Sequence, residues 1–533
     1  KGGGVWGAGG GGVSGRVIDS GTADDGVGLG RASGDVVVDD VFRGKPVTRI
    51  ADGAFSSVSR LTGITIGNNV TEIGDRAFYN CVALEKVSMP DTVESIGTNA
   101  FQSCRALKEI RLSDALTEIP EYAFSYCRAL KEIEIPDNVT QIGAYAFRSC
   151  EVLEDIAFSE SLAEIGESAC SQCDALKEVA FPDALETLGE KSFYDDPLLE
   201  SVTFGKGMLT IGISAFESCP VLDHLTIPDS VEEIGDRAFF ACSALTNIGL
   251  GANVSSVGGY AFYDTACWNN AAEGSVVTVD GWVVGYKQTS EETEVSTTLS
   301  FEEGTLGVAS YAFSDCRFFD TLLLPDSLRY IGERAFNDCT GLVAVVFGSS
   351  ECELLTIGDY AFYGCSALSN VQMEFCTKLT TIGNYAFYNC YRVGVGSYEL
   401  HIPETVTSIG TYAFNNTAAW SAGGLVVIDG WVVGYNGMAL SIAIPEGVIG
   451  ISNYAFYNSQ MLMAITLPQS LKYIGRAAFY GCMLLPGIEI PQTVTQISDD
   501  AIYGCQSPPA LTPQDTVTDH SRSACHASPA PPS

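Results

Sequence analysis

The sequence predicts an α/β solenoid, a stack of coils in which each coil contributes one short parallel strand and one short helical turn. Three observations predict this class. An Ala-Phe pair recurs at a fixed interval, apolar residues alternate in the stretch after each pair, and apolar residues keep a helical spacing around it. A segment of 23 residues cannot bury its apolar face alone, so neighbouring segments must stack.

The second residue of each Ala-Phe pair serves as a marker for the register of the chain. Eighteen positions continue the series, and 12 of the 17 steps between them are 23 residues long. Regular spacing over this length indicates internal repeats rather than separate globular domains. The marker positions are Phe55, Phe78, Phe101, Phe124, Phe147, Cys170, Phe193, Phe216, Phe239, Phe262, Phe313, Phe336, Phe362, Phe387, Phe414, Phe456, Phe479 and Ile502.

A strand is predicted in the second part of each repeat. Val87 and Met89 lie two residues apart, which places both side chains on the buried face of a strand. Pro90 then ends the strand because it has no amide donor. Equivalent pairs are Ile110 with Leu112, Ile133 with Ile135, Val179 with Phe181, and Ile465 with Leu467. One parallel strand per coil is therefore expected.

A short helical turn is predicted around each marker. Ala77, Cys81 and Leu84 are spaced by four and three residues, which suits one apolar face of an α or 3₁₀ turn. Each repeat thus consists of a strand, a Pro-Asp turn, a Gly turn and a short helix.

These residues form the pattern Leu-x-x-Ile-x-Ile-Pro-x-x-Val-x-x-Ile-Gly-x-x-Ala-Phe-x-x-Cys over residues 45–507. The pattern resembles the BspA-type leucine-rich repeat of bacterial and protist surface proteins. The resemblance implies a horseshoe with a parallel sheet on the concave face and helical or 3₁₀ turns on the convex side. It also implies a non-catalytic, secreted or cell-surface protein that adheres to a protein or glycan on a host or neighbouring cell.

The ends of the chain differ in composition from the repeats. Residues 1–34 are Gly-rich and are expected to form a flexible lead-in, and residues 508–533 are Pro-rich and are expected to form a disordered tail. The repeat region spans 35–507, beginning with a strand and cap between Asp35 and Val47. A rod with such ends also suits a structural spacer that presents further modules, which is the alternative function.

Two insertions interrupt the repeats, near 265–300 and 417–445. Each contains an Asp-Gly pair between apolar runs, which is a hairpin signal. Each hairpin is expected either to contact a partner or to seal a break in the strand ladder. The tryptophans that are candidates for partner contact are Trp268, Trp282, Trp420 and Trp431.

Composition excludes several classes of partner. The formal net charge is 28 − 65 = −37, and such a surface repels the phosphate backbone of nucleic acids. No apolar run approaches the ~18 uncharged residues that span a bilayer, so membrane insertion is not expected. The location expected from the resemblance is extracellular or at the cell surface.

The solvent side of the predicted strands carries the candidate binding residues. Four acids follow their markers by eight residues in consecutive repeats, and strands ~4.8 Å apart would bring these like charges together. Lys108, Lys131 and Lys177 or a Ca²⁺ ion could counter this repulsion, which would leave a solvated, partly neutralised face; the alternative is a recognition stripe for a basic partner. The candidates for this concave face are Lys86, Glu109, Arg111, Glu132, Glu134, Asp155, Glu178 and His224.

The sequence offers little for catalysis. Thirteen of the 18 Cys follow a marker by three residues, which indicates a ladder of buried free thiols. Cys170 and Cys173 form a Cys-x-x-Cys pair, but Cys170 merely fills a Phe position. With four His in the chain, no Ser-His-Asp site is predicted, and no catalytic, cofactor-binding or metal-binding residue is assigned.

Tyrosine also keeps to fixed repeat positions. Sixteen of the 23 Tyr lie two residues before a marker or one residue after it. Such strips could bind protein or glycan, because Tyr is enriched in binding surfaces, or they could pack half-buried between neighbouring coils.

Overall fold

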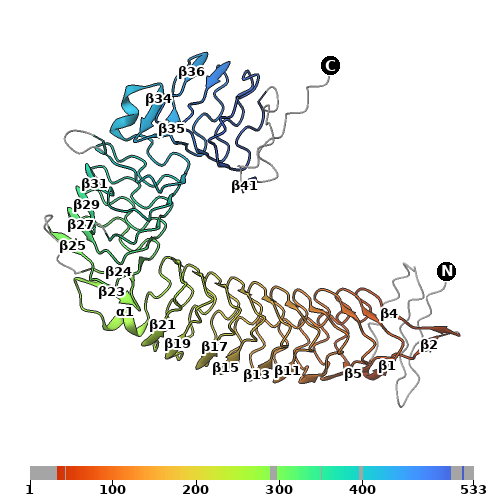
Figure 1. Cartoon of the computed structure of the whole chain (residues 1–533). Helices are drawn as coiled ribbons and strands as arrows, with labels where there is room; N and C mark the ends of the chain where they lie inside the picture. The colour runs from red at the N-terminus through yellow and green to blue at the C-terminus, as the bar shows by residue number, and fades with distance from the viewer. Residues whose placement is uncertain are drawn as a thin grey trace. The chain divides into compact units, whose positions relative to one another are not determined.

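The structure, a computed structural model, shows two compact units, Lys1–Ala272 and Glu273–Ser533. Each unit is a stack of coils in which strands of successive coils lie side by side (Figure 1). Most of the predicted lead-in and most of the predicted tail lie outside the described residues. The structure describes residues 33–42, 44–288, 297–349, 351–394, 400–505 and 519–520.

The first unit contains two parallel ladders of strands rather than one. The first ladder begins with the strand of the cap, β1 (Gly34–Val37). It continues with the strands expected after each marker: β5 (Leu61–Thr65), β7 (Lys86–Ser88), β9 (Glu109–Ile110), β11 (Glu132–Glu134), β13 (Asp155–Ala157), β15 (Glu178–Ala180), β17 (Ser201–Thr203), β19 (His224–Thr226) and β21 (Asn247–Gly249). The second ladder holds shorter strands at the Ile-Gly sequence: β4 (Arg49–Ile50), β6 (Glu72–Ile73), β8 (Ser95–Ile96), β10 (Glu118–Ile119), β12 (Gln141–Ile142), β14 (Glu164–Ile165), β16 (Thr187–Leu188), β18 (Thr210–Ile211), β20 (Glu233–Ile234) and β22 (Ser256–Val257).

Both ladders keep the register of the repeat. Ile133 pairs with Ile156 in the first ladder, and Ile142 pairs with Ile165 in the second, each 23 residues further along the chain. The first unit begins with the predicted cap, in which β1 pairs with β5 and an antiparallel hairpin joins β2 (Val41–Phe42) to β3 (Lys45–Pro46). It ends at the short helix α1 (Ala266–Asn270).

The second unit repeats the arrangement after each of two hairpins. Its first-ladder strands are β25 (Thr298–Ser300), β27 (Thr321–Leu324), β29 (Ala344–Phe347), β31 (Asn370–Gln372), β36 (Ser441–Ala443) and β38 (Ala464–Thr466). Its second-ladder strands are β26 (Gly307–Val308), β28 (Tyr330–Ile331), β30 (Thr356–Ile357), β32 (Thr381–Ile382), β33 (Ser408–Ile409), β37 (Gly450–Ile451), β39 (Tyr473–Ile474), β40 (Gln496–Ile497) and β41 (Asp519–His520).

The hairpins predicted in the two insertions are confirmed. β23 (Ser275–Val279) pairs antiparallel with β24 (Trp282–Lys287), and β34 (Leu425–Ile428) pairs with β35 (Trp431–Tyr435) after a 3₁₀ turn, η1 (Ala418–Ala422). The second strand of each hairpin then pairs in parallel with the next second-ladder strand, β26 or β37. Each hairpin therefore starts a new run of the second ladder.

The helical turns predicted around the markers are not confirmed, because these segments are non-helical turns. Arg76 and Asn80, on either side of Phe78, have positive φ angles of 54° and 57°. A left-handed residue interrupts the right-handed backbone that a helix needs. The same two positions have positive φ in nearly every described coil, so the turn is a regular feature of the repeat. Among the described residues, helices reach only five residues, and none could cross a membrane.

The turn segments are joined to one another by backbone hydrogen bonds. Phe78 N–H donates to Ala100 O at 2.8 Å, and Phe101 N–H donates to Ala123 O at 2.9 Å in the next coil. Glycine is required where successive coils come closest: a Cβ on Gly143 would lie 2.6 Å from the backbone nitrogen of Glu121. This close approach explains the Gly of the Ile-Gly pattern.

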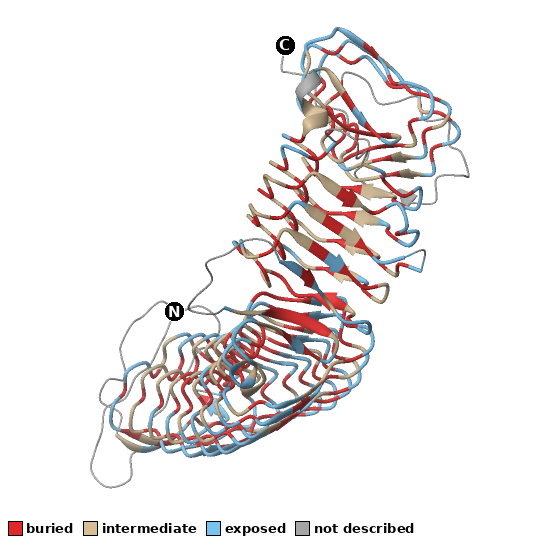
Figure 2. Ribbon diagram, turned by 90° about the vertical axis from the view of Figure 1, so that its left-hand side faces the viewer, coloured by how far each residue is buried: buried red, intermediate tan, exposed pale blue. Residues whose placement is uncertain are grey.

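The marker phenylalanines form the centre of each core. Phe78 is fully buried, and its ring stacks on those of Phe55 and Phe101 with centroids 5.0 and 5.1 Å apart. Figure 2 shows buried residues repeating at the same place in successive coils. Offset stacking of aromatic rings adds to the area that they remove from water. Columns of stacked rings therefore run through both units, and in the second unit the column from Phe313 to Phe414 is followed by a separate pair, Phe456 and Phe479.

The column in the first unit is interrupted at Cys170. Its rings stop at Phe147 and resume at Phe193, which stacks on Phe216 at 5.5 Å. Beside the interruption the buried strand end carries Phe181, whose ring lies edge-on to Phe193 at 5.4 Å. The equivalent positions of the two adjacent coils also hold Phe158 and Phe204, whose rings lie 5.7 and 5.8 Å from that of Phe181, whereas still earlier coils hold the smaller Leu112 and Ile135. Extra aromatic volume therefore accompanies the missing ring.

The predicted horseshoe shape, and the prediction that the first ladder lies on its concave face, stay predictions.

Candidate binding surfaces

The candidate residues of the strand face all lie on the solvent side of the first ladder. The central residue of each strand is buried, as Val87 and Ile133 are, and its neighbours are exposed. This alternation follows from the pleat, which points successive side chains to opposite faces. The exposed candidates are Lys86, Glu109, Glu132, Glu134, Asp155, Glu178 and His224 on strands, and Arg111 directly after β9.

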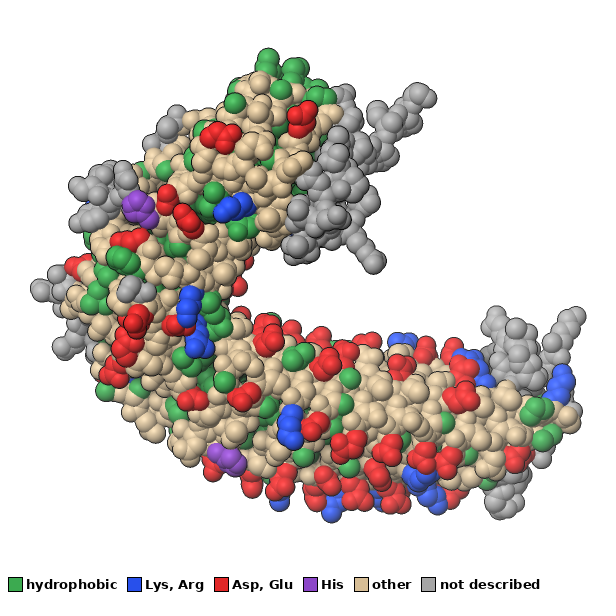
Figure 3. Space-filling view, in the orientation of Figure 1, with side chains coloured by type: hydrophobic (Ala, Val, Ile, Leu, Met, Phe, Trp, Pro, Cys, Tyr) green, Lys and Arg blue, Asp and Glu red, His purple; other side chains and the backbone are tan. Residues whose placement is uncertain are grey.

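Four of these side chains, Glu109, Glu132, Asp155 and Glu178, form the acidic row. They occupy the same position on β9, β11, β13 and β15. Parallel pairing sets Glu132 beside Asp155, and Lys86 beside Glu109 at the start of the row. In Figure 3, acidic side chains gather along the edge of the first unit where Figure 1 labels β11, β13 and β15.

The neighbouring lysines do not neutralise the acidic row. Lys108 Nζ lies 2.8 Å from Glu85 Oε2, and Lys131 Nζ lies 3.3 Å from Glu154 Oε2. Each glutamate occupies the lysine's own repeat position in an adjacent coil, so these pairs form along a different row. The expected role of Lys108 and Lys131 is therefore wrong. Within the described ranges, no ion pair involves a member of the acidic row.

The basic candidates each contact a carboxylate. Arg111 Nη1 lies 2.5 Å from Asp91 Oδ1, and its Nη2 lies 2.9 Å from Asp114 Oδ2. All three side chains are largely exposed, so these pairs contribute little stability. The other two basic candidates make similar contacts, Lys86 with Asp35 at 3.1 Å and His224 Nδ1 with Asp223 Oδ1 at 2.5 Å.

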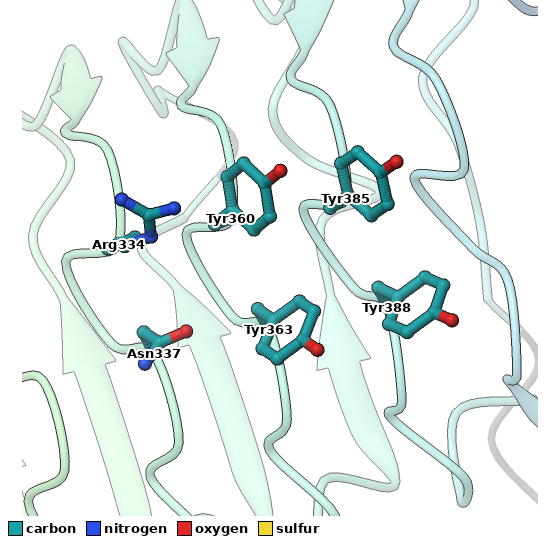
Figure 4. A pocket seen from close by; sticks show the side chains of 6 residues that line it. All are labelled: Arg334, Asn337, Tyr360, Tyr363, Tyr385 and Tyr388. Carbon is teal, nitrogen blue, oxygen red and sulfur yellow. The ribbon is translucent and has the colours of Figure 1, made fainter.

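The second unit carries a groove with a volume of about 420 Å³, the tyrosine groove (Figure 4). Its sides are two rows of side chains from the turn segments on either side of the markers. Tyrosine is common to both rows, and a cation and an amide lie at one end. One row is Arg334, Tyr360 and Tyr385, and the other is Asn337, Tyr363 and Tyr388.

Within each row the rings stack between coils. The rings of Tyr360 and Tyr385 are 4.8 Å apart and 7° from parallel, and those of Tyr363 and Tyr388 are 5.3 Å apart and 5° from parallel. In Figure 4 the hydroxyls of Tyr360 and Tyr385 lie along one edge of the groove, and those of Tyr363 and Tyr388 lie along the other. Burial, together with the neighbouring tyrosines, raises the pKa of Tyr363 and Tyr385, so these hydroxyls stay protonated at neutral pH. The groove therefore offers ring edges and hydrogen-bonding hydroxyls.

Arg334 takes the place of a ring in its row. Its guanidinium carbon lies 5.4 Å from the ring centre of Tyr311 and 4.5 Å from that of Tyr360. The group is planar and can stack on aromatic faces, which a lysine ammonium cannot do in the same way. Arg334 also donates to the Tyr311 hydroxyl, and its Nη1 lies 2.9 Å from Glu333 Oε1. The cation of the groove is thus held in a fixed position.

Two of the four candidate tryptophans lie in the core. Trp282 and Trp431 are each 1% exposed and stack on Tyr330 and Tyr473, with ring centres 6.0 and 5.9 Å apart. Each indole also lies over a second-ladder glycine. The expectation that they contact a partner is therefore wrong, because the hairpins use them to join the ladder.

The other two tryptophans are partly exposed. Trp268, in α1, has its ring 4.7 Å from that of Tyr263. Trp420, in η1, packs over Gly434 of the hairpin that follows, and its carbonyl accepts a hydrogen bond from Asn436 Nδ2 at 3.4 Å. Each retains some surface for a partner.

The predicted ladder of buried free thiols is confirmed for the 13 cysteines that follow a marker by three residues. Cys81 Sγ donates to Phe55 O at 2.9 Å, and Cys104 Sγ donates to Phe78 O at 3.2 Å. Burial raises the pKa of Cys81 to about 11. A thiol with such a pKa is a poor nucleophile at neutral pH. These cysteines are therefore structural.

The two thiols of the Cys-x-x-Cys pair are also buried and structural. Cys170 and Cys173 are fully buried, and burial raises the pKa of both thiols well above the ordinary value. Cys173 Sγ donates to Phe147 O at 3.4 Å, as the other thiols of the ladder do. Across the described ranges, no group of three or more His, Cys, Asp or Glu could hold a metal ion.

Asp196 is a buried polar residue that the sequence analysis missed. It follows the marker Phe193 by three residues and so occupies the thiol position of its coil. Its Oδ1 accepts a hydrogen bond from Cys173 N–H at 2.7 Å, whereas no hydrogen-bond partner is found for Oδ2 or for the nearby Ser192 Oγ. Burial raises the pKa of Asp196 well above its usual range. The sequence signal that could have revealed this buried carboxyl is an Asp at a repeat position that holds Cys in most coils.

Comparison with known proteins identifies the repeat. A family model described as BspA type leucine rich repeat region matches residues 41–154, 140–268, 292–421 and 435–529. No curated protein matches the chain.

Several solved structures resemble the chain at low sequence identity. A leucine-rich repeat protein from Bacteroides ovatus is 22% identical, with 90% of this chain and 94% of that chain covered and a TM-score of 0.32. A leucine rich cell surface protein from Faecalibacterium prausnitzii is 21% identical, with 85% and 87% covered and a TM-score of 0.30. A leucine-rich repeat protein from T. pallidum is 25% identical, with 35% and 77% covered and a TM-score of 0.28.

Proposed function

Because the chain belongs to the BspA-type leucine-rich repeat family, we propose that it is a non-catalytic binding protein, secreted or held at a cell surface. Its partner would be a protein or glycan of a host or neighbouring cell, and binding would mediate adhesion. The observation that carries the proposal is the acidic row, which is exposed and without an ion pair among the described residues.

Buried positions are nearly constant between coils and exposed positions vary, and this difference supports a binding role. Buried positions repeat nearly the same residue in every coil, as Phe101, Phe124 and Phe147 do. The exposed position of the first ladder changes from Lys86 through the acidic row to His224. Residues at that position can therefore vary without disturbing the core, which is what a recognition surface needs.

The charge of the row favours a basic partner. Like charges on neighbouring strands ~4.8 Å apart repel one another, and a bound cationic group would relieve that repulsion. Electrostatic complementarity of this kind mainly raises the association rate and weakens with salt. Binding should therefore be faster at low ionic strength.

The experiment reverses the acidic row and compares it with a matched control. The test variant carries E109K, E132K, D155K and E178K, and the control carries E94K, E118K, E186K and E233K, which are exposed glutamates in or next to the second ladder. Both variants change the net charge by the same amount. Binding to a panel of purified basic extracellular proteins is measured by surface plasmon resonance at two salt concentrations.

The proposal predicts that the test variant loses at least tenfold in association rate while the control retains binding. Equal loss in both variants would show a general charge effect and reject the acidic row as the site. If neither wild type nor variants bind any protein or glycan probe, the spacer function gains support instead.

The tyrosine groove supports a glycan as the alternative partner. Its hydroxyls and the fixed guanidinium of Arg334 suit the hydroxyl-rich surface of a sugar, and Tyr is enriched in binding surfaces. A glycan array probed with wild type and with Y363A/Y388A tests this surface. A signal that the acidic-row variant keeps and the tyrosine variant loses would assign glycan binding to the groove.

A further inference from the structure

Two cysteines of the second unit stand outside the repeated thiol ladder. Cys352 and Cys376 do not follow a marker by three residues. They lie on the corners that precede β30 and β32, in the two repeats whose marker steps are lengthened to 26 and 25 residues. Extra residues and an extra cysteine thus occur together in two successive coils.

The two corners are held next to each other. Strands β30 and β32 pair in register, with Ile357 beside Ile382. An ion pair joins Lys378 to Glu353, the residue that follows Cys352. Each cysteine also closes a tight turn, since Cys352 N–H donates to Ser349 O at 3.2 Å and Cys376 N–H donates to Met373 O at 3.0 Å. Their positions are therefore set by backbone contacts.

The two sulfur atoms are 2.8 Å apart. A disulfide bond is about 2.05 Å long, so closure needs a movement of only about 0.75 Å. Cys352 is 2% exposed and Cys376 is fully buried. By contrast, Cys365 and Cys390 in the same coils donate to the backbone carbonyls of Phe336 and Phe362, both at 3.1 Å.

We propose that Cys352 and Cys376 form a disulfide that cross-links the corners of two successive coils. The oxidant is a disulfide donor, either a thiol–disulfide oxidoreductase or a small-molecule disulfide. The Cys352 thiolate attacks one sulfur of the donor, and the other donor sulfur leaves as a thiolate. Cys376 then attacks Cys352 Sγ and expels the second donor sulfur. Two protein thiols lose two protons and two electrons, and the donor disulfide is reduced to two thiols.

The surroundings of the pair agree with this order of attack. The side-chain contact between the two sulfurs lowers the pKa of Cys352 and raises the pKa of Cys376. A thiolate is the nucleophile in disulfide exchange, which makes Cys352 the first to react. Because both sulfurs are buried in the folded chain, exchange occurs during folding, when the two corners have come together but the surrounding side chains do not yet cover the sulfurs.

A cross-link here would stabilise the second unit where its repeats depart from 23 residues. Disulfides act mainly by restricting the unfolded chain, and this bond would close a loop of 24 residues. Reduction should therefore lower the thermal midpoint of the second unit by about 5 °C or more.

The experiment maps the cysteines of the full chain after export to the bacterial periplasm, where disulfides form. The protein is alkylated in urea without reductant and digested with chymotrypsin, which cleaves after aromatic residues. Tyr360 and Phe375 lie between the two cysteines, so cleavage separates them. Mass spectrometry should then find the Cys352 and Cys376 peptides linked, and the link should disappear after reduction.

Variants show whether the bond stabilises the protein. Reductant should lower the melting temperature of wild type and of the control C390S, but should leave C352S/C376S unchanged. The proposal is overturned if both cysteines are recovered alkylated from periplasmic protein, or if either is linked to a ladder cysteine. These results concern only the thiols, so they are independent of whether the acidic row binds a partner.

Discussion

Asp196 occupies the position of a buried thiol, and its Oδ1 accepts a hydrogen bond from the backbone N–H of Cys173 at 2.7 Å. The carboxyl is therefore held at a buried position that carries a thiol in most other coils. Its second oxygen has no partner among the described residues. Burying an ionised carboxylate without a counter-charge is costly, so burial raises the pKa of Asp196 and favours the protonated form in the folded chain.

Asp196 should make stability fall as pH rises. Its folded pKa is raised, so above the ordinary value of 3.8 the unfolded chain ionises while the folded chain does not. The stability contribution is fully present below that value and is lost as pH rises toward the folded pKa. The variant D196N should therefore gain stability over wild type as pH increases. Urea unfolding from pH 4 to 8 measures the difference, and D195N, at the exposed neighbour, is the control. Parallel curves for D196N and wild type would contradict the prediction.

The interruption at Cys170 predicts a coupling with Phe181. C170F alone should destabilise the first unit by about 1–3 kcal/mol, because the extra ring enters a region already filled with aromatic side chains. F181L alone should also destabilise it, since it removes buried volume. Together they should cost less than the sum of the single changes, because the ring is moved rather than added. A double-mutant cycle by urea denaturation tests this, and additive effects would argue that the two sites are independent.

The close contact between coils predicts that Gly143 cannot be replaced. G143A places a methyl group 2.6 Å from the Glu121 backbone nitrogen, which cannot move independently of its coil. A loss of about 1–3 kcal/mol in unfolding free energy is expected. G249A is the matched control, because nothing lies within 4 Å of the Cβ built at Gly249. Similar melting temperatures for both variants would refute the steric explanation.

Because the guanidinium of Arg334 is stacked between two rings, we predict that the planar shape of this side chain contributes more to stability than its charge does. R334K keeps the charge but loses the planar group between Tyr311 and Tyr360, and should cost about 0.5–1 kcal/mol. R334Y should be close to wild type, because Tyr122 and Tyr145 already stack at this repeat position with ring centres 4.7 Å apart. Chemical denaturation of the two variants and wild type gives the comparison. Greater stability of the lysine variant would reverse the conclusion.

Much of the fold could be predicted because the repeat is regular and its buried positions are strongly apolar. Val87 and Met89 marked a strand, and the Asp280-Gly281 turn marked a hairpin. The second ladder was missed because its strands, such as Glu118–Ile119, are only two residues long and show no alternation. The prediction of helical turns was wrong because the spacing of apolar residues alone does not reveal a residue with a left-handed backbone, such as Asn80.

The candidate surface was predicted less completely. Exposure of the acidic row followed from strand alternation, which depends on sequence alone. The partners of Lys108 and Lys131 depended on which side chains face each other across coils. In a parallel ladder those are residues at the same repeat position, so Lys108 meets Glu85 rather than Glu109.

The column of phenyl rings has a consequence for how the molecule can evolve. Because Phe101 and Phe124 occupy equivalent places one coil apart, excising the residues between them would rejoin chain ends that already match. Recombination within the coding repeats can thus shorten or lengthen the protein by whole coils while matching buried residues still meet at the new junction. The number of coils is therefore a property that selection can adjust in single genetic steps.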